Sequence, residues 1–190
     1  MLKTHHHSIQ WTHHTQRNAM IIAATIEICD YAIKHLMSSV LKPKTIQVLL
    51  DTPPASEDGT IPLGSCSSHC TDSMIPGLIT IIVDPTQSFE DFTDTLFHEF
   101  CHAEQQFTGR LGTSRIRNGD NPTIKMWKGR AFSTRLIDYI DWPWEIEARE
   151  VAAKLTRDIG PLKQRVEQLV AKHEEDVARA KAKQAEEVAA

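Results

Sequence analysis

The chain has few of the features that mark secreted and membrane proteins. It contains only four cysteines in 190 residues, too few and too scattered for a disulfide framework, so we expect free thiols in a reducing compartment. No apolar run approaches the roughly 20 residues that span a bilayer, and the polar N-terminal residues lack the apolar core of a secretory signal. We therefore expect a cytoplasmic protein without a membrane partner.

Aromatic residues and excess charge of one sign are also scarce. The formal net charge is −4, so no general basic field attracts nucleic acid, and we expect no nucleic-acid partner. The aromatic content is 6%, but the total hydrophobic content of 41% is enough for the core of one domain. Histidine is plentiful, with ten in the chain. Several lie in residues 1–15, which show no periodic pattern and are expected to be a flexible arm.

Three segments show the apolar spacing of amphipathic helices within a single domain expected over residues 16–160. They are about 17–40, 89–107, and Pro143 to the break at Gly160-Pro161. Asp141 is placed to cap the last of these helices, and Pro143 suits its first turn. The remaining residues, 161–190, are helix-prone and carry many charges of both signs around a thin apolar stripe. We expect a projecting helical tail that is solvated or supports weak self-association.

Strand patterns are shorter. TIQVLL (45–50) and LITIIV (78–83) are typical of buried strands, and we expect them to be neighbours in a small mixed sheet. IKMWKGRAF (124–132) is typical of one short strand or a hairpin. CSSHC, which contains Cys66 and Cys70, lacks the second pair of ligands that a structural zinc site requires. These two cysteines are therefore interpreted as loop thiols between strands.

The most specific pattern is HEFCH at residues 98–102. Chance gives about 0.04 matches to H-E-x-x-H in a chain of this composition. On a helical wheel His102 lies about 40° from His98, while an aromatic stripe of the same segment lies on the opposite side. This spacing presents two nitrogens to one Zn²⁺ ion at the ~2.0–2.1 Å of Zn–N bonds. Glu99 lies between the two faces, where it can act as general base toward a zinc-activated water molecule.

A third protein ligand must come from elsewhere in the chain. The extended motif with a third histidine is absent, because Gln105 and Thr108 occupy its glycine and histidine positions, and His173 lies in the charged tail. The helix after Pro143 offers two acids instead. On its wheel Glu145 lies about 60° from the centre of the apolar face and Glu147 about 100° from it. Glu145 is favoured as the inward-pointing ligand, with Glu147 as the alternative.

These residues resemble the pattern of gluzincin-type zinc metallopeptidases, in which a strand, an H-E-x-x-H helix and a glutamate on a later helix follow in order. The closer similarity is to small predicted metallopeptidases of phages and prophages, over about residues 20–158. It is carried by the segments LITIIVDP, HEFCHAEQ, MWKGRAF and YIDWPWEIEA. The resemblance implies a zincin-like α+β fold, peptide hydrolysis, and a peptide or protein substrate. It also implies that the zinc ligands are His98, His102 and Glu145, with Glu99 as the general base.

The resemblance further implies that the strand LITIIV forms the rim of the cleft and pairs with an extended substrate. One position departs from the pattern: some gluzincins have an aspartate that supports a ligand histidine, and Arg149 stands there instead. Other residues must then support the ligands. Tyr139, Arg130 and Arg135 are candidates for stabilising an oxyanion, although a packing role is the simpler interpretation of Tyr139.

A second function from a different class is a non-catalytic zinc-binding domain that acts as an interaction module. Glu99 favours catalysis over this alternative, because a structural site has no need of a base beside its ligands. A structural site would also close its fourth position with a protein ligand, and the sequence offers no good candidate for one.

Overall fold

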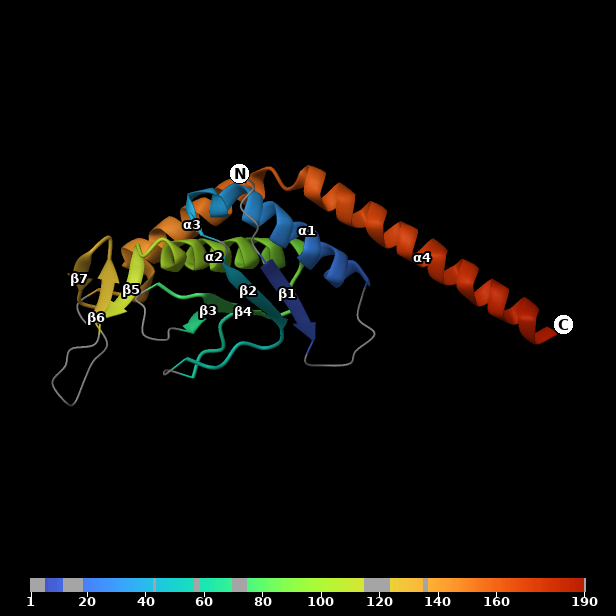
Figure 1. Cartoon of the computed structure of the whole chain (residues 1–190), viewed down its shortest axis with the longest axis horizontal. Coiled ribbons are helices and arrows are strands. Elements are labelled where there is room, and N and C mark those ends of the chain that lie inside the picture. Colours follow the sequence, from blue (N-terminus) through green and yellow to red (C-terminus); the bar gives the residue numbers. More distant parts are fainter. Residues whose placement is uncertain are drawn as a thin grey trace.

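The structure, a computed structural model, describes residues 6–11, 19–42, 44–56, 59–69, 75–114, 124–134 and 137–189. Over these ranges the chain forms four α-helices and two small sheets, which confirms the expected α+β class. Figure 1 shows the helices gathered on one side of the larger sheet, with the last helix projecting away from the rest.

The larger sheet is mixed and has the strand order β1-β2-β4-β3. Its strands are β1 (His6–Trp11), β2 (Thr45–Leu50), β3 (Gly64–His69) and β4 (Leu78–Val83). β2 and β4 are parallel, with Val48 opposite Ile81, whereas β3 runs antiparallel to β4. The predicted pairing of residues 45–50 with 78–83 is therefore confirmed.

The first strand differs from the sequence prediction. His6–Trp11 pairs in parallel with β2 at one edge of the sheet, where a flexible arm over residues 1–15 was expected. The alternation of Ile9 and Trp11 with polar residues is a period-2 signal of a strand, and it was missed among the histidines. Residues 1–5 and 12–15 lie outside the described part of the chain.

The predicted role of LITIIV as the rim strand is wrong. This segment is β4, and both of its edges are occupied, by β2 on one side and by β3 on the other. A strand with two partners has no backbone groups left to pair with a substrate. The terminal strands of the described sheet are β1 and β3. Cys66 lies within β3 and not in a loop, and Cys70 lies outside the described residues.

The helices follow the predicted segments closely. They are α1 (Ala19–Leu36), α2 (Phe89–Phe107), α3 (Pro143–Arg157) and α4 (Gly160–Ala189). Short 3₁₀ turns follow α1 and precede α3: η1 (Met37–Ser39) and η2 (Tyr139–Asp141). Pro143 occupies the first turn of α3 as expected, but the cap position is Trp142, without a side-chain cap. Asp141 belongs to η2 and does not cap α3, so that prediction is wrong.

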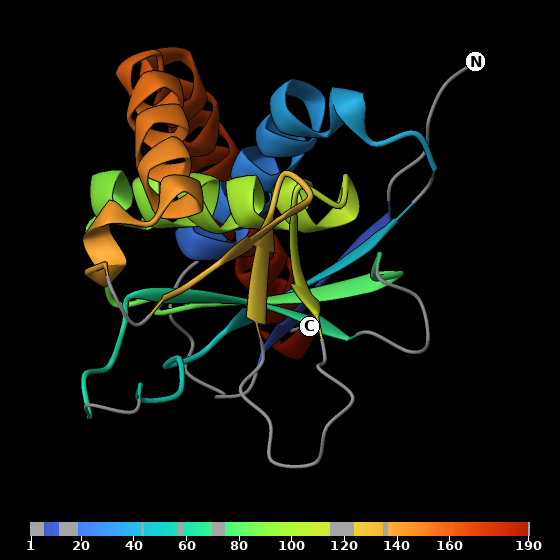
Figure 2. The same ribbon diagram turned by 90° about the vertical axis from the view of Figure 1, so that its left-hand side faces the viewer.

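The core lies between α2, α1 and the inner strands. Figure 2 shows α2 lying across the sheet, with α3 and α1 on its other side. The fully buried large side chains include Phe97, Phe100, Ile28, Ile79 and Ile81. Burying each such side chain stabilises the fold by about 1.5–3 kcal/mol. Because α2 contributes to this core along its length, its position and rotation are tightly set.

The smaller sheet is an antiparallel meander beside the first turn of α3. Its strands are β5 (Leu111–Ser114), β6 (Ile124–Trp127) and β7 (Arg130–Phe132). The two-residue turn between β6 and β7, Lys128-Gly129, has positive φ at both positions, which matches the twist of a tight hairpin. Of the two alternatives left open for residues 124–132, one short strand or a hairpin, the structure shows the hairpin.

The first turns of α4 pack against the core of the protein. Leu162 and Val166 are buried against the core that includes α1, and Arg165 pairs with Glu27. From residue 171 to 184 every side chain is exposed. Figure 1 shows the second half of α4 extending beyond the other elements. Within the described ranges no helix combines the length and the apolar character needed to cross a membrane.

Two leucines on α4 test the difference between its packed first turns and its exposed second half. Leu162 is 5% exposed and Leu169 is 41% exposed. Leu162→Ala is expected to lower the free energy of unfolding by about 2–4 kcal/mol, because it leaves a cavity against α1. Leu169→Ala, the matched control, should stay within about 0.5 kcal/mol of wild type. Urea denaturation followed by circular dichroism measures both, and equal losses would contradict the described packing.

Candidate metal centre

Local sequence signals define where α2 begins and ends. The Ser88 hydroxyl accepts a hydrogen bond from the Asp91 backbone N–H at 3.1 Å and donates one to the Asp91 carboxylate at 2.7 Å. Glu90 and Asp91 also place negative charge in the first turn, where it stabilises the helix dipole. The last residue of the helix is Phe107. Two residues later Gly109 has a φ of +74°, the left-handed conformation that glycine favours and that prevents the helix from continuing. The segment between these ends is a well-defined helix.

The two faces of α2 have different environments. Phe97 and Phe100 are fully buried in the core, and this fixes the rotation of the helix about its axis. His98 and His102 then project toward α3, whose first turn carries Glu145. Ala148 is fully buried on the inner face of α3, and its small side chain lets the two helices approach closely.

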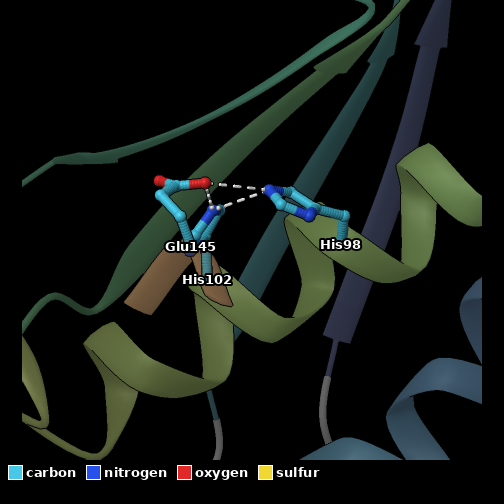
Figure 3. Close-up of side chains that lie close together, drawn as sticks. All are labelled: His98, His102 and Glu145. Carbon is cyan, nitrogen blue, oxygen red and sulfur yellow. Dashed lines mark hydrogen bonds and ion pairs between the residues drawn. The ribbon is translucent and has the colours of Figure 1, made fainter. Parts of the chain in front are cut away.

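Three side chains from these two helices converge on one point (Figure 3). The Nε2 atoms of His98 and His102 are 3.0 Å apart. Glu145 Oε2 lies 3.2 Å from His98 Nε2 and 3.3 Å from His102 Nε2. These are the residues that the sequence favoured, and they form a group that could hold a metal ion.

The triangle has the dimensions of a tetrahedral metal site. Ligands 2.0–2.1 Å from a common ion in tetrahedral geometry are separated by about 3.3 Å. The three observed separations of 3.0, 3.2 and 3.3 Å are close to this value. Two imidazole nitrogens and one carboxylate oxygen are donors suited to zinc and to related transition metals. The residues present therefore fit a bound metal ion.

The electrostatics of the triangle favour positive charge beside Glu145. Glu145 Oε2 is buried and has no hydrogen-bond partner among the described residues, although the Nε2 atoms of His98 and His102 lie within ion-pair distance of it. Burial raises the pKa of Glu145, but the contacts and charges of His102 and His98 outweigh it and hold that pKa at about 2. Burial lowers the pKa of His102, and Glu145 raises it beyond its usual value. An ionised carboxylate facing two imidazoles in a buried place is stabilised by a cation.

Glu99 lies beside the triangle and is not part of it. Its side chain is only 7% exposed, and it is close enough to His102, His98 and Glu145 to interact electrostatically with all three. Burial raises the pKa of Glu99; the two histidines oppose this rise and Glu145 adds to it. A buried carboxylate that is next to the ligands without belonging to them is available for proton transfer.

Glu147, the alternative third ligand, points elsewhere. Both of its carboxylate oxygens accept hydrogen bonds from Arg110 Nη1, at 2.8 and 2.7 Å. One of them also accepts from Gln105 Nε2 at 3.1 Å. Of the two acids that the helical wheel offered, Glu145 lies with the two histidines and Glu147 lies with Arg110. Gln105, whose carbonyl oxygen is 2.9 Å from His102 Nδ1, is a site residue that the sequence analysis missed. On the wheel it lies within about 20° of His98, and this shared face was the available signal.

Of the three residues considered as oxyanion-stabilising groups, one lies beside the metal centre. Tyr139 is 58% exposed, but its hydroxyl contacts Glu145, and loss of solvent around the hydroxyl together with the Glu145 charge raises the pKa of Tyr139. It therefore lies at the edge of the centre. Arg130 is exposed on β7, and Arg135 lies outside the described residues.

Known proteins provide no family assignment for this arrangement. No protein-family model, curated protein or solved structure matches the chain. The chemistry of the centre is therefore inferred from its own residues and their geometry.

The first test of the centre is metal binding. The protein is expected to bind one Zn²⁺ ion, and Glu145→Ala should weaken binding by more than about 100-fold because one of three protein ligands is lost. Glu150→Ala, on the exposed side of the same helix, is the control and should bind zinc like wild type. Chelator competition and metal analysis of the purified proteins measure both. Unchanged affinity in Glu145→Ala would show that Glu145 is not a ligand.

A second test concerns the contact between β3 and Glu99. A Cβ atom at Gly64 would lie 2.6 Å from Thr95 Cγ2 and 2.9 Å from Glu99 Oε1. Gly64→Ala should therefore displace β3 or the Glu99 carboxylate and destabilise the protein by about 1–3 kcal/mol. Gly77→Ala is the matched control, since a Cβ there meets no atom within 4 Å. Chemical denaturation compares the two variants, and equal stability would mean that β3 does not press on Glu99.

Proposed function

We propose that this protein is a zinc-dependent peptidase that hydrolyses peptide bonds with Glu99 as the general base. The observation that carries the proposal is the position of Glu99: a buried carboxylate adjacent to three convergent ligand atoms, but not one of them. A site that only stabilised the fold would have no use for such a group. The H-E-x-x-H spacing that places it there is also rare by chance.

The ligand set supports zinc as the ion. Two imidazoles and one carboxylate are a common donor set of catalytic zinc sites, which keep one position for substrate or solvent. When bound, zinc supplies Lewis acidity, which polarises a carbonyl group and makes water more acidic. His98, His102 and Glu145 would hold the ion.

Glu99 carries out the proton transfers of the proposed reaction. As the oxygen of water forms its bond to the carbonyl carbon, the Glu99 carboxylate accepts the proton that the water loses. It then donates this proton to the amide nitrogen as the carbon–nitrogen bond breaks, so that an acid and an amine leave. Burial raises the pKa of Glu99, which makes its carboxylate a stronger proton acceptor.

The substrate is proposed to be an extended peptide lying along β3. This strand is terminal in the described sheet, and Gly64 in it packs directly against Glu99. A peptide beside this strand would have its backbone next to the ligand triangle. Pairing between backbones depends little on side chains, so the expected sequence preference is weak.

The sharpest test is Glu99→Gln. This variant should fold and bind zinc like wild type, yet lose peptide hydrolysis by roughly 10²–10⁴-fold, because the proton acceptor is gone while the ligands remain. The measurement is digestion of an unfolded protein by wild type and variant at equal zinc occupancy. Glu90→Gln, an exposed acid in the first turn of the same helix, is the control and should keep full activity.

Three results would change the assignment. Equal activity of Glu99→Gln and wild type would show that Glu99 is not the base. Loss of zinc from the variant would show that Glu99 supports the ion itself. A wild-type protein that binds zinc but cleaves no member of a broad peptide library would favour the non-catalytic zinc-binding module.

A further inference from the structure

The side chain of Gln105 occupies an unusual position for a polar group. It is on α2, its exposed fraction is 0%, and it is among the largest fully buried side chains of the protein. Burying an amide is costly unless its hydrogen bonds are made. The partners that satisfy Gln105 therefore show what the residue is for.

The carbonyl oxygen of Gln105 faces His102. Oε1 is 2.9 Å from His102 Nδ1, while Nε2 of the same amide donates to Trp144 O and to Glu147 Oε2, each at 3.1 Å. Both of these partners are acceptors, so the amide has only one consistent orientation. Oε1 must then accept a hydrogen bond from the N–H of His102 Nδ1. The lone pair of the neutral imidazole is thereby placed on Nε2, the atom that faces the centre.

The amide nitrogen of Gln105 holds the other ligand-bearing helix. Its bond to the carbonyl oxygen of Trp144 fixes the first turn of α3, and Glu145 is the next residue. One side chain thus contacts a ligand on α2 and the backbone adjacent to a ligand on α3. The separation between the ligand atoms of His102 and Glu145 depends on both contacts.

The second hydrogen bond of the amide nitrogen connects Gln105 to a network of ion pairs. Glu147 accepts from Gln105 and is held by Arg110, which also pairs with Glu104. Glu104 is buried and accepts a further hydrogen bond from Ser39 at 2.6 Å. The Arg110 guanidinium lies over the ring of Trp127 in the smaller sheet, 5.6 Å from its centroid. Glu147 is therefore a fixed acceptor that orients the amide.

These contacts explain why the position holds an amide and not a carboxylate. A carboxylate could accept from His102, but it could not donate to Trp144 O, and it would place a second negative charge against Glu147. An apolar side chain could make no hydrogen bond to His102, to Trp144 O or to Glu147. An amide both accepts and donates, and glutamine reaches all three partners from one helix position.

We propose that Gln105 is the positioning residue of the metal centre: it fixes the imidazole of His102 and the first turn that carries Glu145, and Glu147 with Arg110 fixes Gln105. The inference rests on the metal centre described above and is independent of whether that centre cleaves peptides. Residues that orient a ligand histidine commonly change metal affinity by 10–100-fold when they are replaced.

The experiment compares four variants: Gln105→Glu, Glu147→Ala, the double variant Gln105→Glu/Glu147→Gln, and Gln106→Glu. Gln105→Glu should weaken zinc binding by about 10–100-fold, and Glu147→Ala by a smaller factor of about three to ten. The double variant exchanges the amide and the carboxylate, so it should bind zinc more tightly than Gln105→Glu alone. Gln106→Glu changes the next residue on α2, whose amide contacts Cys66 Sγ at 3.5 Å, and should bind like wild type.

Three readouts separate positioning from a general effect on folding. Zinc affinity is measured by chelator competition, ligand geometry by the visible absorption spectrum of the Co²⁺-substituted proteins, and stability by thermal unfolding without metal. A positioning role predicts a changed Co²⁺ spectrum in Gln105→Glu and its partial recovery in the double variant. Glu147→Ala, which alters a half-exposed residue, keeps the test valid should Gln105→Glu fail to fold.

The inference is overturned by variants that lose thermal stability but keep wild-type zinc affinity and Co²⁺ spectrum, because Gln105 would then be only a packing residue. It is also overturned by a wild-type protein that binds neither Zn²⁺ nor Co²⁺, a result that removes the metal centre itself. A wild type that binds zinc and cleaves no peptide removes the proposed activity alone. In that case the predicted affinity differences still decide the role of Gln105.

Discussion

Three potential ligand atoms that converge on one point are the constraint on which the rest of this structure depends. His98, His102 and Glu145 place two nitrogens and an oxygen within 3.0–3.3 Å of one another, and the oxygen has no hydrogen-bond partner among the described residues. A cation at this point, or a proton on one of the imidazoles, offsets the negative charge of the buried carboxylate. The packing of α2 against α3 holds the atoms there.

α2 makes this arrangement possible because its two faces serve different purposes. One face places Phe97 and Phe100 in the core, and this burial contributes several kcal/mol and fixes the rotation of the helix. The other face carries the two histidines and Gln105 toward α3. Stability and function are therefore linked through one helix: a change that rotated α2 within the core would also move the ligands.

Polar groups around the centre are arranged as alternating donors and acceptors. His102 donates to Gln105, Gln105 donates to Glu147, and Glu147 is paired with Arg110. Each buried group is satisfied by the next, which keeps the cost of burying so many polar atoms low. The chain of contacts ends at the ring of Trp127, so the smaller sheet also helps to define the geometry of the ligands.

The sequence alone determined the features that depend on local spacing. Helical and strand periods located α1, α2, α3, β2, β4 and the β6–β7 hairpin, because these patterns are properties of neighbouring residues. The H-E-x-x-H spacing likewise placed His98, Glu99 and His102 on one helix, and the wheel favoured Glu145. The third ligand was favoured only by a modest angle, since the wheel shows which side of a helix faces inward and not what lies opposite.

Only the tertiary structure decided the features that depend on contacts between distant segments. It paired Glu147 with Arg110 and left Glu145 for the centre, and it made Gln105 a partner of His102 and Trp144. It also placed β3 and β1 (His6–Trp11) at the two ends of the larger sheet, with LITIIV in its interior. Strand order and hydrogen-bond partners are set by which segments meet in space. The hydrophobic periodicity of a single segment carries no information about which other segments it will contact.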